Sequence, residues 1–174
     1  MMARIKHYPA LLALCALVVA CGQLKAPPAN IAAVAQVDGI VISEPRLRAP
    51  PQGRDMTAGY FILENTTTTS KQLIGIKSPL AKRVELHDHV VGTNNMMQMR
   101  KINDVVIPAK STILFAPAGI HIMLFELSPL VKEGTKLPIT LKFLGGAEAT
   151  FDLPVVNNPS DNYKDEKARD RHQH

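Results

Sequence analysis

Residues 137–155 read Leu-Pro-Ile-Thr-Leu-Lys-Phe-Leu-Gly-Gly-Ala-Glu-Ala-Thr-Phe-Asp-Leu-Pro-Val. Two short apolar segments, residues 137–144 and 149–155, flank the pair Gly145-Gly146. Adjacent glycines supply the positive φ angles that a tight turn between antiparallel strands requires. We therefore predict two antiparallel strands joined by a hairpin turn at this glycine pair.

Short apolar segments of the same kind continue upstream as far as residue 37. They recur at intervals of roughly 8 to 12 residues with Gly, Pro and Asn between them, which is typical of a β-sandwich or barrel. The turn at residues 132–135, Lys-Glu-Gly-Thr, is one such separator. No segment keeps a helical apolar period long enough to compete. We therefore predict an all-β domain whose further strands are residues 37–43, 59–65, 72–77, 83–89, 96–102, 105–107, 112–116 and 121–127.

The first 20 residues have the organisation of a secretory signal peptide. Arg4 and Lys6 form a short positive region, and residues 10–20 are apolar but too short to span a bilayer as a helix. Residues 18–21, Val-Val-Ala-Cys, resemble the lipobox of bacterial lipoproteins, which predicts cleavage before Cys21 and lipidation of its sulfur. The alternative is an ordinary signal peptide cut nearby, which would leave Cys21 as a free thiol.

A lipidated Cys21 predicts a protein on the periplasmic side of a bacterial envelope, held to the membrane by its acyl chains. Gly22 follows the cysteine, and the absence of Asp there favours the outer membrane. Residues 21–36 are rich in Ala and Pro and are predicted to be a tether. Residues 37–156 are the predicted β domain, which carries the metal donors described below. Residues 157–174 are polar and charged, so we expect a disordered tail.

Composition narrows the function classes. The formal net charge of +5 is mild and scattered, and the chain has no Trp, so nucleic acid is not an expected partner. No nucleophile–base arrangement, phosphate-binding loop or zinc-hydrolase motif is visible, so we do not expect an enzyme. Cys15 and Cys21 are the only cysteines, and signal removal with lipidation of Cys21 would leave no thiol for a disulfide or a thiolate metal site.

Two imidazoles and two thioethers follow the spacing H-x11-M-x21-H-x-M, in the residues His87, Met99, His121 and Met123. Thioether sulfur is soft and favours Cu(I), whereas Zn, Ca and Mg sites use thiolate, imidazole or oxygen ligands. Side chains alternate across a strand, so His121 and Met123 share one face and form half of a site. Taken singly, each Met is more often core filler and each His more often a surface residue; the joint spacing favours a copper site.

Weaker candidates lie beside this set. His89 follows His87 by two residues and could add a harder site for Cu(II), although a solvated side chain is the simpler reading. His172 and His174 form an H-x-H pair near the C-terminus that could bind Cu(II) or Zn weakly. Met97 and Met99 share one face of their predicted strand, so the methionine ligand must be chosen between them.

The stretch from Val37 to Val155 resembles the periplasmic copper chaperone family PCu(A)C. The matching segments are residues 58–61 (AGYF), 78–81 (SPLA), 84–87 (VELH), 97–100 (MQMR), 117–124 (PAGIHIML) and 130–134 (LVKEG). The resemblance implies a cupredoxin-like Greek-key β-sandwich that holds Cu(I) outside the cytoplasm. It also implies delivery to the CuA centre of cytochrome oxidase, alongside Sco-type proteins.

The family pattern is H-x10-M-x21-H-x-M, so the first interval of this chain is one residue longer. Counting back from His121 selects Met99, and the extra residue is easiest to absorb in the loop at residues 92–95. His89 stands where the family often has Met. Two functions remain open: a metallochaperone that delivers Cu(I) to an apo target, and a copper-buffering or resistance lipoprotein without a dedicated target. Both need the same four ligands.

Overall fold

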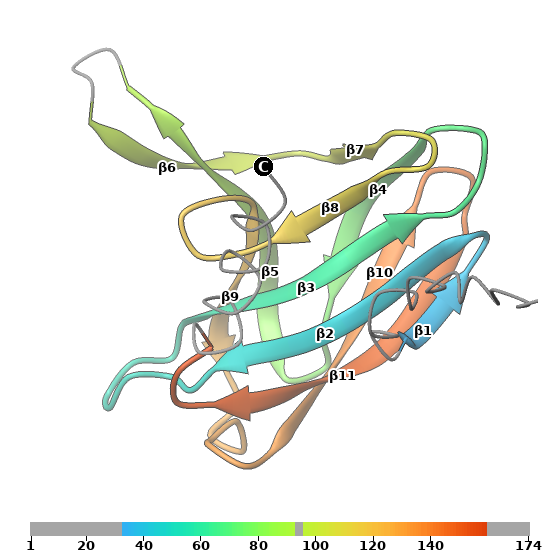
Figure 1. Cartoon of the computed structure of the whole chain (residues 1–174). Helices are drawn as coiled ribbons and strands as arrows, with labels where there is room; N and C mark the ends of the chain where they lie inside the picture. Colours follow the sequence, from blue (N-terminus) through green and yellow to red (C-terminus); the bar gives the residue numbers. More distant parts are fainter. Residues whose placement is uncertain (1–32, 93–95, 160–174) are drawn as a thin grey trace, which may run out of the picture. The chain divides into compact units, whose positions relative to one another are not determined.

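The computed structural model describes residues 33–92 and 96–159, and in these residues all regular structure is β-strand. No helix in this part of the chain is long and apolar enough to cross a membrane. The strands are β1 (Ala33–Val37), β2 (Ile40–Arg48), β3 (Thr57–Asn65), β4 (Lys71–Lys77), β5 (Ala81–Val91), β6 (Met97–Ile102), β7 (Val105–Ile107), β8 (Thr112–Phe115), β9 (His121–Leu127), β10 (Lys136–Phe143) and β11 (Glu148–Val156). The predicted all-β fold is confirmed (Figure 1).

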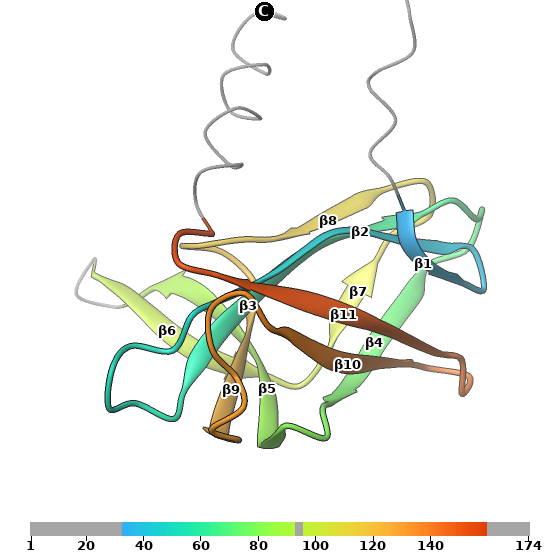
Figure 2. The ribbon, with the colours of Figure 1, turned by 90° about the horizontal axis from the view of Figure 1, so that it is seen from below.

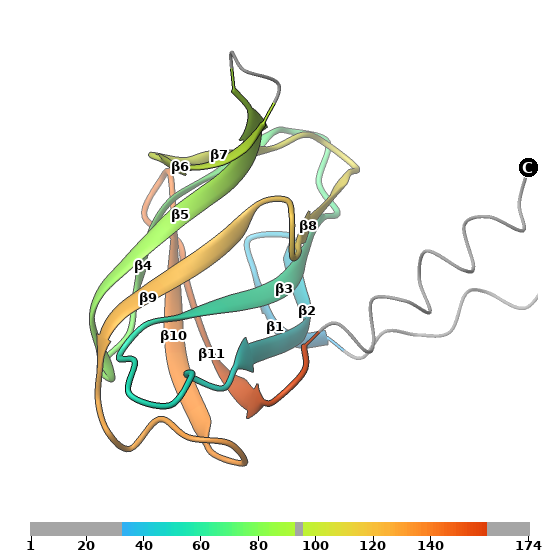
Figure 3. The same cartoon turned by 90° about the vertical axis from the view of Figure 1, so that its left-hand side faces the viewer.

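The strands form two layers. The first has the order β6-β5-β9-β3-β2, with β1 added beside β2 and β8 sharing with β9 one edge of β3. The second has the order β11-β10-β4-β7. Figure 3 shows β5, β9 and β3 in front of β4, β10 and β11, and Figure 2 shows the same layers from below. A short parallel pairing of β11 with β2 joins the layers along one side.

The hairpin at the end of the domain forms as its sequence predicts. In β10 and β11 every second residue is buried, so one face of each strand contributes to the core. Gly145 and Gly146 take φ angles of 95° and 92°, which residues with a Cβ rarely adopt. The glycine pair therefore sets the register that turns Leu137, Ile139 and Leu141 inward.

Aromatic contacts connect the two layers through the core. Phe61 of β3 stacks on Phe115 with ring centres 4.3 Å apart and meets Phe151 of β11 edge-on at 5.7 Å. Phe61 and Phe115 are fully buried, and burying each such ring stabilises the fold by about 1.5–3 kcal/mol. These rings fill the core between the two sheets, on the side of the first sheet opposite the metal donors.

The start of the domain differs from the prediction. Residues 37–43 were expected to be one strand, but Asp38 and Gly39 form a turn with φ angles of 45° and 75°. An Asp-Gly pair favours this kind of hairpin turn, so β1 ends before it and β2 starts after it. β1 begins at Ala33, inside the predicted tether, because residues 33–37 pair with β2 and add Ala35 and Val37 to the core. The ends of the remaining predicted strands shift by two residues or fewer.

Candidate metal centre

Strand pairing brings the predicted donors onto one face of the first sheet. β9 lies between β5 and β3, and His87 of β5 pairs with His121 of β9. On the other side of β5, His89 pairs with Met99 of β6. Directly paired residues project to the same face. Ile122 and Leu124 project from β9 into the core, so His121 and Met123 occupy the face that turns away from the second sheet.

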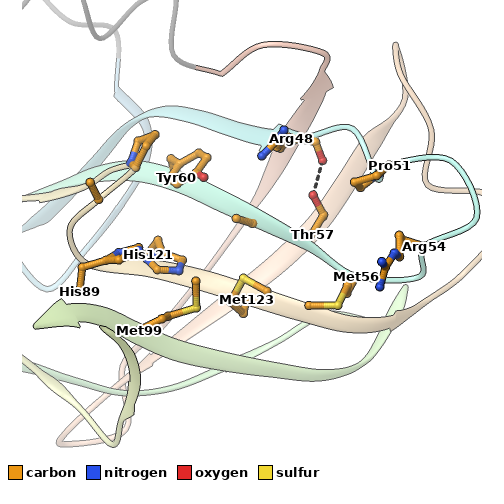
Figure 4. A pocket seen from close by; sticks show the side chains of 13 residues that line it. Arg48, Pro51, Arg54, Met56, Thr57, Tyr60, His89, Met99, His121 and Met123 are labelled. Atoms are coloured by element: carbon orange, nitrogen blue, oxygen red, sulfur yellow. Dashed lines mark hydrogen bonds between the residues drawn. The ribbon is translucent and has the colours of Figure 1, made fainter. Parts of the chain in front are cut away.

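A pocket of about 600 Å³ opens on this face, far larger than a single metal ion. Figure 4 shows His89, Met99, His121 and Met123 gathered in one part of it, with Met56 and Arg54 farther along. The residues that line it are Arg48, Pro51, Arg54, Met56, Thr57, Ala58, Tyr60, His89, Met99, Pro117, Ala118, His121 and Met123. Three of the four predicted ligands therefore line one cavity, together with His89.

His121 is prepared to bind a metal through one nitrogen. Its Nδ1–H donates a 2.8 Å hydrogen bond to the carbonyl oxygen of Gly119, which can only accept, so Nε2 keeps its lone pair in the neutral ring. Only 2% of His121 is exposed. Burial lowers the pKa of His121, and the neighbouring His89 and His87 lower it further. The ring is therefore held in the neutral form that a metal requires.

His87 is held from one side and open on the other. Its Nε2–H donates to a carboxylate oxygen of Glu85 at 2.9 Å. Its Nδ1 is buried and has no hydrogen-bond partner among the described residues. A carboxylate on the far nitrogen is the usual way to orient a metal-binding imidazole. His87 does not line the pocket, but its ring centre lies 5.9 Å from that of His121.

Glu85 is the anion that orients His87. It also accepts hydrogen bonds from Lys101 at 3.0 Å and Arg83 at 2.9 Å. The hydrogen bond from His87, followed by those from Lys101 and Arg83, lowers the pKa of Glu85 to about 2. The carboxylate therefore stays ionised and remains a strong acceptor for the His87 ring at any physiological pH.

His89 takes a larger place in the site than its sequence position indicated. Its ring centre lies 5.1 Å from that of His121, and it lines the pocket that His87 does not. Its Nδ1 lies 3.4 Å from the Gly119 oxygen that His121 already uses, which is long for a hydrogen bond. The ring of His89 is therefore held by a weaker hydrogen bond than the rings of His87 and His121.

The structure distinguishes the two candidate methionines. Val91 pairs with Met97 and His89 with Met99, so both methionines project to the metal face, as strand alternation predicts. Only Met99 of the two lines the pocket. Met99 is 48% exposed, whereas Met123 is 7% exposed, so one thioether is accessible and the other is fixed in the sheet.

Other features of the site were not anticipated. Tyr60 lines the pocket with its ring centre 6.4 Å from that of His121, and burial raises the pKa of its hydroxyl. Arg48 and Arg54 come from the end of β2 and the following loop, far from the motif in sequence. No local spacing signal marks these three residues. Cys21, His172 and His174 lie outside the described residues. Within the described part, no three His, Cys, Asp or Glu side chains already surround one point as an ion would require.

Comparison with known proteins identifies a matching family and a similar lipoprotein. A family model described as "Putative lipoprotein LpqE-like" matches residues 40–155. The chain is 31% identical over 131 residues to "Putative lipoprotein Lxx21020" of Leifsonia xyli subsp. xyli, covering 74% of this chain and 78% of that protein. It therefore matches a family model over most of its folded part and a relative over most of its length.

Two solved structures show the same fold. The copper-bound PCuAC domain from PmoF2 superposes with a TM-score of 0.60 at 28% identity, covering 71% of this chain and 97% of that domain. The solution structure of CuI-DR1885 from Deinococcus radiodurans has a TM-score of 0.55 at 28% identity, covering 79% and 84%. The expected cupredoxin-like sandwich is thus confirmed, and the chain belongs to the LpqE-like proteins of the PCu(A)C copper chaperone family.

Proposed function

We propose that this protein binds one Cu(I) through His87, Met99, His121 and Met123 and passes it to an apo copper protein. The observation that carries the proposal is the convergence of Met99, His121 and Met123 on one pocket. The ring centre of His87 lies 5.9 Å from that of His121, and its buried Nδ1 has no hydrogen-bond partner among the described residues. Two imidazoles and two thioethers form a soft donor set that suits Cu(I) better than harder ions.

The ring separations support this ligand set. A metal lies about 3 Å from the centre of an imidazole that binds it, given a metal–nitrogen distance of about 2 Å. Two rings on one ion therefore have centres at most about 6 Å apart. The 5.9 Å between His87 and His121 satisfies that limit. The neutral state of His121 and the oriented ring of His87 reduce the cost of assembling the site.

X-ray absorption of the Cu(I)-loaded protein tests the metal assignment. The expected spectrum contains both nitrogen and sulfur scatterers, and a spectrum with nitrogen and oxygen alone contradicts the thioether ligands. Zn(II) should bind far more weakly than Cu(I) in the same preparation.

Delivery is favoured over storage by the exposure of Met99. A ligand on an accessible strand can be displaced by an incoming donor while the buried pair on β9 keeps the ion. We propose the CuA subunit of cytochrome oxidase as acceptor, acting alone or with a Sco-type protein, because the family resemblance points to it. Lipidation of Cys21 would hold the protein on the periplasmic side of the envelope, with the outer membrane favoured.

Mixing the Cu(I)-loaded protein with an apo CuA domain distinguishes the two functions. If the protein is a chaperone, we expect copper to move to the CuA domain. The two proteins are separated after mixing, and the copper content of each is measured. Retention of copper by this chain, with tight Cu(I) binding intact, would instead support a copper-buffering lipoprotein.

A further inference from the structure

We propose that His89 gives this pocket a second binding mode, in which three imidazoles hold Cu(II) where the His2Met2 set holds Cu(I). The inference rests on the proposed function, because it concerns the same cavity. The family pattern includes one imidazole before the methionine, whereas this chain places two, His87 and His89, on the same face of β5.

Both outer rings lie close to the central one, although the three do not already surround one point. His121 lies in the middle, with ring centres 5.9 Å from His87 and 5.1 Å from His89. Both separations fall within the limit of about 6 Å for two imidazoles on one metal. Strand pairing fixes the backbone of all three residues on one face of the sheet, so the second mode requires the side chains of His87 and His89 to turn toward the same point beside His121. Of the three rings, His89 has the weakest hydrogen bond, so its rotation breaks little existing interaction.

The donors match what each oxidation state prefers. Cu(II) favours tetragonal sites with nitrogen and oxygen ligands, whereas thioethers favour Cu(I). A third imidazole therefore adds more to the binding of Cu(II) than to that of Cu(I). The buried Nδ1 of His87, which has no hydrogen-bond partner in the part of the chain that the structure describes, is an independent sign that a ligand belongs at this place.

The experiment uses the full chain with His172→Gln and His174→Gln, which removes the competing H-x-H pair at the C-terminus. In this background, His89→Leu is compared with Gln98→Leu, a residue of β6 whose pairing with Val90 places it on the opposite face. Cu(II) binding is followed by electron paramagnetic resonance, and Cu(I) binding by competition with a chromophoric chelator.

We expect His89→Leu to weaken Cu(II) binding about tenfold or more while changing Cu(I) binding less than about threefold. The Cu(II) signal should lose coupling to one nitrogen, and Gln98→Leu should change neither affinity. The inference is overturned if the background protein does not bind Cu(II), or if His89→Leu leaves Cu(II) binding unchanged or weakens both ions equally. Absence of tight Cu(I) binding in the background protein would contradict the proposed function instead.

Discussion

Replacing Glu85 with Gln tests whether the carboxylate beside His87 prepares that ring for copper. Glu85 accepts the Nε2–H of His87 at 2.9 Å, so in the neutral ring the lone pair that can bind a metal lies on Nδ1. Gln has nearly the same shape, and its amide oxygen can still accept, but the bond loses its charge. Charge-assisted hydrogen bonds are roughly twice as strong as neutral ones, so the ring is held less firmly and its Nδ1 becomes a weaker donor to the metal.

The structure sets the size of the expected changes in Cu(I) affinity and in folding stability. Loss of a carboxylate partner of a metal-binding imidazole typically lowers metal affinity by about 10- to 100-fold. We expect the lower end, about tenfold or 1.4 kcal/mol, because Gln keeps an acceptor in place. The effect on folding should be smaller. The side chains of Arg83 and Lys101 are 54% and 58% exposed, and exposed ion pairs contribute about 0–1 kcal/mol each.

The assay is a Cu(I) competition titration of the wild type, Glu85→Gln and a control, Glu148→Gln. Glu148 forms an exposed ion pair with Lys77 at 3.0 Å on the second sheet, so its loss removes the same charge far from the pocket. The control should bind Cu(I) like the wild type. Equal affinities for all three proteins, with each folded by thermal denaturation, would refute the role of Glu85 and weaken the case for His87 as a ligand.

Three further predictions rest on the geometry of the domain, and a fourth rests on the signal sequence. Met99→Leu removes the thioether and should weaken Cu(I) binding about tenfold or more. Because Leu has nearly the same volume, the free energy of unfolding should change by less than about 1.5 kcal/mol. Met97→Leu should barely change Cu(I) binding, and the reverse ranking of the two variants would contradict the register of β6. Gly59→Ala places a Cβ 2.9 Å from the Ile122 side chain and should cost about 1–3 kcal/mol in urea unfolding, against little for Gly75→Ala, whose nearest atom is 3.8 Å away. Because the pKa of Glu85 lies at about 2 instead of 4.5, the ionised carboxylate stabilises the fold above pH 4.5. That contribution is lost as the pH falls toward 2, so urea unfolding of Glu85→Gln should show a shallower acid dependence in this window. Cys21→Ser should release the protein from the membrane fraction, and a wild type already free in the periplasm would contradict lipid anchoring.

Turn chemistry made most of the strands predictable from the sequence. Gly145-Gly146 fixed the last hairpin, and strand alternation correctly grouped Met97 with Met99 and His121 with Met123. The same reasoning would have found the Asp38-Gly39 turn, but the apolar residues on both sides of it suggested one continuous strand. A short turn inside a continuous apolar stretch is therefore harder to predict than the strands on either side of it.

The arrangement of the site was only partly predictable. Alternation along β5 places Glu85, His87 and His89 on one face, so the carboxylate beside His87 was within reach of the sequence. His87 and His89 share this face, but only His89 lines the pocket. That difference depends on how β5 pairs with β6 and β9, which the local sequence does not encode. The same holds for Tyr60, which comes from another strand.

The two halves of the site differ in how firmly the fold holds them. His121 and Met123 lie on β9, between β5 and β3 and nearly inaccessible to solvent. Met99 lies on β6, which in the described part of the chain pairs with β5 alone, and nearly half of its surface is exposed. An edge strand opens at a lower free-energy cost than a central one, because fewer contacts must break. Under the proposed function, an acceptor would therefore displace Met99 first, while the β9 pair keeps the ion until the new ligands are in place.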